Sequence, residues 1–141
     1  MDNKIINPIC PYCNKESKYV NSSIIYGKDY GMLYLCEDCN AYCGVHKGTN
    51  IPLGTLANRI LRDLRKKAHS YFDRFYKEKL IDQIYKKKSD LSRRNKSYLW
   101  LSLQLNLPLN ETHIGMFDED RCKDVIRICS DKINQLNSSD G

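Results

Sequence analysis

The chain of 141 residues lacks a long apolar run, because none approaches the roughly 20 residues that cross a bilayer. Its N-terminus lacks the basic, apolar and small-residue segments of a secretory signal peptide. We therefore expect a cytoplasmic protein that does not enter a membrane. Nucleophile motifs, phosphate-binding loops and open metal sites are missing as well, and this argues against the common enzyme classes.

Cysteine is the residue type that stands out, with seven in the chain. In a reducing compartment, thiols are better explained as metal ligands and buried side chains than as disulfides. The odd number of cysteines agrees with that interpretation.

Four of the cysteines form two C-x-x-C pairs, and an asparagine follows each pair directly. The pairs are Cys10–Cys13 and Cys36–Cys39, followed by Asn14 and Asn40. Two such pairs supply the four thiolates of a tetrahedral zinc site. The residue after the second cysteine of such a knuckle often adopts a left-handed conformation, which asparagine tolerates. The spacing therefore predicts one structural zinc ion bound by four cysteines.

The first pair has a competing interpretation, since Cys-Pro-Tyr-Cys is also the redox motif of glutaredoxins. In that fold the motif follows a buried strand and opens a helix. Here only a weak apolar segment precedes it, and no apolar helical period follows. We therefore favour zinc over redox chemistry.

The remaining cysteines are not needed for a set of four ligands. Cys43 and His46 have ligand-like spacing after Cys39, but we expect Cys43 in the core or at an edge of the zinc module. Cys122 and Cys129 lie on the apolar face of a predicted helix and are expected to be small core residues.

The sequence predicts an α+β protein, with an N-terminal zinc ribbon over residues 1–50 and a helical region over 51–136. Tyrosine and β-branched residues predict strands at 19–20 and 24–26, a turn at 27–29, a strand at 32–35 and a third strand at 41–45. Polar residues and Pro52 mark the boundary at 48–52. We expect the two parts to form one compact unit.

Apolar periodicity predicts three helices in the second part. A basic helix spans 53–86 with a kink or break near 70–80, a second spans about 90–106, and an amphipathic helix spans 119–136. Residues 98–107 also alternate as a strand would, but leucine and glutamine favour a helix. Asp118 and the acidic residues after it suit the start of the last helix. Residues 137–141 are expected to be a disordered tail.

Positive charge is concentrated in the middle of the chain. Residues 59–96 hold fourteen basic and five acidic side chains, whereas residues 1–58 are neutral in sum and 97–141 carry −3. This asymmetry predicts a nucleic-acid surface, with a solvated helix face as the alternative. The candidate contact residues are Arg59, Arg62, Arg65, Lys66, Lys67, Arg74, Lys86, Lys87, Lys88, Arg93 and Arg94.

A few histidines and aspartates could form a polar site. His69 and Asp73 share a helix face, while His113 and Asp118 flank a loop. A histidine–carboxylate pair is the minimum for acid–base chemistry. Together with His46 they are possible site residues, although a role in tying helices and loop together is favoured.

With these residues described, the chain resembles a bacterial and bacteriophage family of small zinc-finger-containing proteins of unknown function. Cys43 stands where an aliphatic residue is expected, and Thr112 where a cysteine often precedes the histidine, so neither position is a required ligand. The resemblance implies a phage or prophage origin and supports the four ligands. It rests on Cys10–Cys13, Cys36–Ala41, Gly44–His46, Gly48-Thr49, Pro52–Ala57, Arg65, Ala68-His69, Phe72-Asp73, Tyr98, Trp100-Leu101, His113–Asp118 and Cys122.

The sequence therefore predicts a non-enzymatic zinc-ribbon protein that contacts nucleic acid through a basic helical surface. One alternative is a protein-interaction factor that docks on a host or virion protein. A weaker alternative is an enzyme that uses the histidines and aspartates. No membrane partner is expected.

Overall fold

The computed structural model describes residues 4–138. The chain forms two compact units, Met1–Arg62 and Asp63–Gly141. No described helix is long and apolar enough to cross a membrane. As predicted, a small antiparallel sheet and the clustered cysteines lie in the N-terminal part, and the long helices lie in the C-terminal part.

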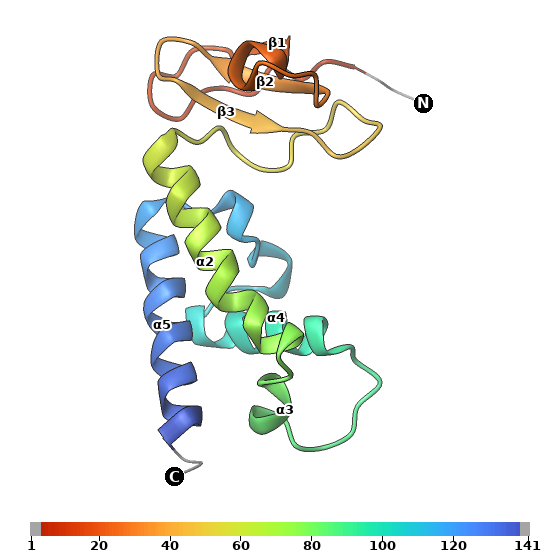
Figure 1. Ribbon diagram of the computed structural model, residues 1–141, viewed down its shortest axis with the longest axis vertical. Helices are drawn as coiled ribbons and strands as arrows, with labels where there is room; N and C mark the ends of the chain where they lie inside the picture. Colours follow the sequence, from red (N-terminus) through yellow and green to blue (C-terminus); the bar gives the residue numbers. More distant parts are fainter. Residues whose placement is uncertain (1–3, 139–141) are drawn as a thin grey trace. The chain divides into compact units, whose positions relative to one another are not determined.

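The first unit is built on a three-stranded antiparallel sheet in the order β1-β2-β3 (Figure 1). Its strands are β1 (Lys18–Asn21), β2 (Met32–Cys36) and β3 (Ala41–Gly44). Tyr19 and Cys43 both pair with Tyr34, so their side chains share one face of the sheet. Tyr34 is fully buried on this face.

The segment at 24–26, predicted as strand before the hairpin turn, is instead the short helix α1 (Ser23–Tyr26). The backbone N–H groups of Ile25 and Tyr26 both donate to the Ser22 carbonyl, at 3.0 and 2.9 Å. Gly27 then ends the turn in a left-handed conformation, with φ of 71°. The β propensity of isoleucine and tyrosine is therefore overridden by a glycine-terminated helical turn.

Residues 51–58 belong to the first unit, which corrects the prediction that a helix begins at residue 53. Val45 bridges Pro52, and Tyr42 bridges Ala57, so this segment runs back along β3. Leu56 and Ala57 are buried in the first unit. Because the backbone groups of Leu53 and Ala57 pair with Gly44 and Tyr42 of β3, this segment is not available for a helix.

The long helix α2 (Arg59–Lys77) begins after Asn58, whose side-chain oxygen accepts the N–H of Leu61 at 3.0 Å. It ends close to the predicted break. Lys79 follows with a left-handed φ of 61°, and the short helix α3 (Ile81–Ile84) comes next. The single basic helix predicted over 53–86 is therefore two helices of very different length.

Two further helices complete the second unit, α4 (Arg93–Leu105) and α5 (Glu119–Ser138). Short turns of 3-10 helix, η1 (Leu109–Glu111) and η2 (Ile114–Met116), join them. The helical prediction for 98–107 is confirmed up to Leu105, and Asn106 then ends the helix in a left-handed conformation. Helix α5 continues two residues past the predicted end at 136, and residues 139–141 of the predicted tail lie outside the described chain.

Aromatic residues of α2 and α4 form the core of the second unit. Phe75 stacks on Trp100 with ring centroids 4.6 Å apart, and Phe72 contacts Tyr98 at 4.7 Å. Helix α5 contributes its buried stripe of Cys122, Val125, Cys129, Ile133 and Leu136. Cys122 and Cys129 are thus core residues, as predicted, and burial raises the pKa of their thiols to about 11 and about 12.

Candidate metal centre

The first cysteine pair lies in a tight turn before β1. The Cys10 N–H donates to the Lys15 carbonyl at 2.8 Å, and the Asn14 N–H donates to the Cys10 carbonyl at 2.8 Å. Asn14 is left-handed, with φ of 62°. No helix follows Cys13, which agrees with a metal-binding knuckle and not with a glutaredoxin motif.

The second pair forms the turn between β2 and β3. Cys36 ends β2, Ala41 begins β3, and the Asn40 N–H donates to the Glu37 carbonyl at 3.3 Å. Asn40 is also left-handed, with φ of 50°. The predicted left-handed asparagine after each pair is therefore confirmed at both positions.

The fold brings the four sulfur atoms of Cys10, Cys13, Cys36 and Cys39 together, and we call them the cysteine cluster. All four sulfurs lie within 4.8 Å of one another, and those of Cys13 and Cys36 are 3.6 Å apart. Tetrahedral zinc with Zn–S bonds of about 2.3 Å requires sulfurs about 3.8 Å apart. The cluster therefore fits one zinc ion, as predicted.

The closeness of the thiols affects their ionisation. Desolvation and the neighbouring thiols raise the pKa of Cys39 to about 12. The backbone N–H of Lys15 lowers the pKa of Cys13, so the Cys13 thiol loses its proton more readily than the Cys39 thiol does. A bound zinc ion would stabilise all four thiolates. Since four sulfurs leave no position for water or substrate, such a metal stabilises the fold and does not catalyse.

The cysteine cluster is part of the core of the first unit. Cys10 and Cys36 are buried together with Tyr34, Ala41, Cys43 and Leu56. The Tyr34 hydroxyl donates to the Asn50 carbonyl at 2.5 Å and accepts the Ile6 N–H at 3.2 Å. The metal ligands and the few large side chains of this unit therefore order one another.

Between the first two ligands, Tyr12 connects the cysteine cluster to the start of α2. Its hydroxyl accepts the N–H of Asn58 at 3.2 Å. The same Asn58 caps α2. On the outer side of the knuckles, Lys15 and Asp38 form an ion pair at 3.2 Å, and both side chains are largely exposed.

Cys43 and His46 lie outside the cysteine cluster. The Cys43 sulfur accepts the Gly54 N–H at 3.2 Å and is buried between β3 and the segment that follows. His46 is engaged through its backbone, which donates to Ile51 at 2.9 Å. Within residues 4–138, the cysteine cluster is the one group of histidine, cysteine and carboxylate side chains placed to hold a metal.

The possible polar site is only partly assembled. His69 Nδ1 lies 3.9 Å from Asp73 Oδ1, and burial lowers the pKa of His69 despite this carboxylate. Asp118 instead caps α5, because it accepts the Arg121 N–H at 2.8 Å. His113 lines a hollow with Arg94, and no hydrogen bond or ion pair joins it to the other three in the described chain.

Several predicted contact residues are engaged within the protein. The Arg65 Nε donates to the Phe117 carbonyl at 3.0 Å, and Arg62 lies over the Tyr42 ring at 3.8 Å. Arg74 pairs with Glu78 at 2.8 Å, Arg93 with Asp82 at 2.9 Å, and Arg94 lies over Tyr98 at 4.8 Å. Arg59, Lys66, Lys67, Lys86, Lys87 and Lys88 are exposed and form no ion pair with a described residue.

The three consecutive lysines border a shallow depression of about 670 Å³, which we call the lysine hollow. It holds five cationic side chains against two carboxylates, one of which is already paired with Arg93. Lys96 belongs to it and was missed in the sequence, because only the fold places it beside residues ten positions earlier. The lining residues are Asp82, Tyr85, Lys86, Lys87, Lys88, Ser89, Asp90, Arg93 and Lys96.

Comparison with known proteins agrees with this geometry. A family described as a zinc-finger-containing domain matches residues 6–132, which is nearly the whole chain and includes the cysteine cluster. No significant match was found among curated proteins or among solved structures. With the four ligands in place and both units covered, the chain belongs to this family of zinc-finger-containing domains.

Proposed function

We propose that this protein is a non-enzymatic zinc-finger-containing binding protein that contacts nucleic acid through the lysine hollow. The zinc ion stabilises the first unit, and the contact residues lie in the second. The resemblance of its motifs to a bacterial and bacteriophage family supports a phage-related origin, with the protein acting in the host cytoplasm.

The observation that carries the proposal is the unbalanced charge of the lysine hollow. Lys86, Lys87 and Lys88 are exposed and unpaired among the described residues, and Lys96 lies beside them. Holding like charges together is unfavourable unless an anionic partner offsets them. Phosphates are the natural partner, because each lysine contact releases condensed counterions. Tyr85 lines the same hollow and offers a ring for stacking.

The test is a binding titration over a series of salt concentrations, using the zinc-loaded full chain. The slope of log K against log salt gives the number of phosphate contacts. The double variant Lys87→Ala/Lys88→Ala removes two cations from the hollow. We expect it to reduce the slope by roughly 1.4 for single strands and roughly 1.8 for duplexes, if both lysines contact phosphates.

The matched control is Lys123→Ala/Lys132→Ala, which removes the same charge from α5. We expect this control to leave the salt slope close to that of the wild type. Equal losses in both variants would show a diffuse charge effect and contradict the lysine hollow. Binding that is undetectable at low salt for single-stranded and double-stranded DNA and RNA would contradict the proposed function as a whole.

A different observation favours the alternative of a host or virion protein partner. Leu91 and Leu109 are about half exposed, and they line a hollow of about 460 Å³ with Tyr98, Leu99 and His113. Exposed apolar side chains around a depression are typical of a protein-docking site. A stoichiometric protein that co-purifies after nuclease treatment, and is lost with Leu109→Asp, would support this function. Purification of the chain alone after that treatment would contradict it.

A further inference from the structure

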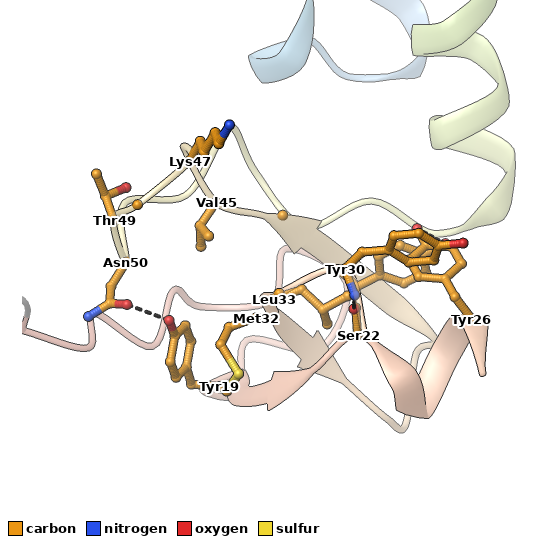
Figure 2. A pocket seen from close by; sticks show the side chains of 14 residues that line it. Tyr19, Ser22, Tyr26, Tyr30, Met32, Leu33, Val45, Lys47, Thr49 and Asn50 are labelled. Atoms are coloured by element: carbon orange, nitrogen blue, oxygen red, sulfur yellow. Dashed lines mark hydrogen bonds between the residues drawn. The ribbon is translucent and has the colours of Figure 1, made fainter. Parts of the chain in front are cut away.

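A groove of about 590 Å³ lies on the first unit, beside α1, the start of β2 and the residues that follow β3 (Figure 2). Tyr26 and Tyr30 lie together on one side of it, and Tyr19 and Lys47 lie toward the other side. Tyrosine is therefore the dominant side chain of the groove. Neither the zinc ion nor the lysine hollow accounts for this arrangement.

Tyr26, Tyr30 and Tyr42, which all line the groove, form an ordered aromatic cluster. The Tyr26 ring meets Tyr42 edge-on with centroids 6.0 Å apart, and it meets Tyr30 in the same way at 5.9 Å. The Tyr26 and Tyr42 hydroxyls are 3.2 Å apart and hydrogen-bonded. Arg62 covers the Tyr42 ring at 3.8 Å. Each ring thus holds its neighbour, so the cluster presents a preformed surface.

The outermost ring of the cluster is left open to solvent. Tyr30 is 71% exposed and Tyr26 is 53% exposed, although both carry a large apolar ring. Burial of its hydroxyl and the bond to Tyr42 raise the pKa of Tyr26 to about 12, so its phenol stays neutral at physiological pH. A neutral, flat and accessible ring is suited to stacking against another planar group.

The surroundings of the groove are cationic. Lys47 lines it, and Lys28 is an exposed residue between Tyr26 and Tyr30 in the chain. The nearest acid in sequence is Asp29. Its carboxylate stays charged while it accepts the Gly31 N–H at 2.9 Å and the Asn21 side-chain amide at 3.0 Å, so it is one acid against the cations of Lys28, Lys47 and Arg62. A planar partner that also carries negative charge therefore complements the groove.

We infer that this tyrosine groove binds unpaired bases of single-stranded nucleic acid, which stack on Tyr30 and Tyr26 while phosphates contact Lys28 and Lys47. Aromatic rings flanked by cations are the usual means of binding single strands. Duplex bases do not reach the rings, because they stay stacked on each other. The inference rests on the proposed function and adds to it the strandedness of the partner.

The experiment compares a dye-labelled oligothymidylate with a duplex of the same length, by fluorescence anisotropy on the zinc-loaded full chain. Tyr30→Ala is expected to weaken single-strand binding by between about 5-fold and about 150-fold, the range for loss of one stacked base. Tyr30→Phe keeps the ring and should bind as the wild type does. The salt slope should stay unchanged in both variants, since no charge is altered.

Ile24→Ala is the matched control, because Ile24 is 58% exposed on α1 and does not line the groove. It should leave binding unchanged. Zinc content and the far-ultraviolet circular dichroism spectrum confirm that each variant is folded. Wild-type affinity in Tyr30→Ala, or an equal loss in Ile24→Ala, overturns the inference. Full competition by thymidine monophosphate at stoichiometric concentration also overturns it, because the groove would then be a nucleotide pocket.

The lysine variants separate this inference from the proposed function. Loss of binding in Lys87→Ala/Lys88→Ala with none in Tyr30→Ala overturns the tyrosine groove and keeps the lysine hollow. Loss in Tyr30→Ala with none in the lysine variant keeps the groove and overturns the hollow. A wild-type chain that binds no nucleic acid at low salt overturns both.

Discussion

Removal of zinc should unfold the first unit and leave the second unit folded. The cysteine cluster is part of the first unit's core, whereas the core of the second unit holds no ligand of the cluster. Phe75 and Trp100 stack in that second core, with Trp100 only 4% exposed. A chelator should therefore act on one part of the chain alone.

The magnitudes support a complete loss of the first unit's fold. Its large buried side chains contribute about 2 kcal/mol each, or about 10 kcal/mol together. A structural zinc ion contributes about 10–16 kcal/mol at neutral pH. Because folding also costs conformational entropy, apolar burial alone does not stabilise this unit. The large buried residues are Leu33, Tyr34, Leu35, Leu56 and Leu61.

Trp100 is the single tryptophan of the chain and lies in the second unit, so its emission reports on that unit. Six of the ten tyrosines lie in the first unit, so on addition of EDTA we expect their part of the near-ultraviolet tyrosine signal to be lost while the Trp100 emission maximum stays constant. Cys39→Ala should reproduce this state. Cys43→Ala, which removes a buried thiol outside the cluster, should keep one zinc ion per chain.

Two results would refute the reasoning. If Trp100 emission shifts to the red at the same chelator concentration at which the first unit's tyrosine signal is lost, the two units unfold together. If the tyrosine signal survives removal of zinc, the apolar core of the first unit is sufficient without metal.

Three further predictions follow from the same structure. Phe75→Ala should lower the free energy of unfolding of the second unit by about 3–5 kcal/mol in urea titrations. Leu103→Ala, at a site 64% exposed, should change it by less than about 0.5 kcal/mol. Similar losses in the two variants would contradict the assignment of Phe75 to the core. Asn40→Ala should cost about 1–2 kcal/mol, because φ is 50° there, and Asn40→Gly should cost less; the reverse order would contradict the left-handed turn. Zinc binding should release protons at pH 7, because without metal desolvation and the neighbouring thiols raise the pKa of Cys39 to about 12, and the pKa of Cys36 is raised as well, despite the Cys39 backbone N–H. Since both thiols are protonated below these values, zinc affinity should rise with pH, and calorimetry in buffers of different ionisation enthalpy would detect the protons; an affinity independent of pH would contradict this.

The metal site was predictable because its signal is local. Two C-x-x-C pairs, each followed by asparagine, encode both the ligands and the turn that carries them. The helices α4 and α5 were likewise predictable from apolar periodicity over more than ten residues. In these parts of the chain, neighbours in sequence determine the structure.

The errors arose where distant residues determine the structure. The apolar period that begins at Leu53 resembles a helix, but Pro52 and Ala57 pair with residues near β3. Such pairing leaves no signature in the segment itself. In the same way, the sequence shows fourteen basic residues in the middle of the chain, but it does not show which of them are engaged by other groups of the protein. Arg65 donates to Phe117, which lies 52 positions later, and only the fold reveals that this cation is engaged.

The tyrosine groove had no sequence signal that set it apart. Tyr26 was predicted as a strand residue before a turn and Tyr42 as part of a third strand, whereas Tyr30 was assigned to no element. Their shared groove depends on the α1 turn and on the placement of β3 beside β2.

The hydroxyl of Tyr12 gives the metal site an influence beyond its own ligands. Tyr12 lies between Cys10 and Cys13, and it holds the Asn58 amide that precedes α2. Asn58 in turn accepts the Leu61 N–H. We therefore expect zinc binding to order the first turn of α2 through Tyr12 and Asn58. In hydrogen exchange, the amides of Asn58 and Leu61 should gain protection as zinc binds. Tyr12→Phe should abolish the gain in protection at the Asn58 amide while the metal stays bound.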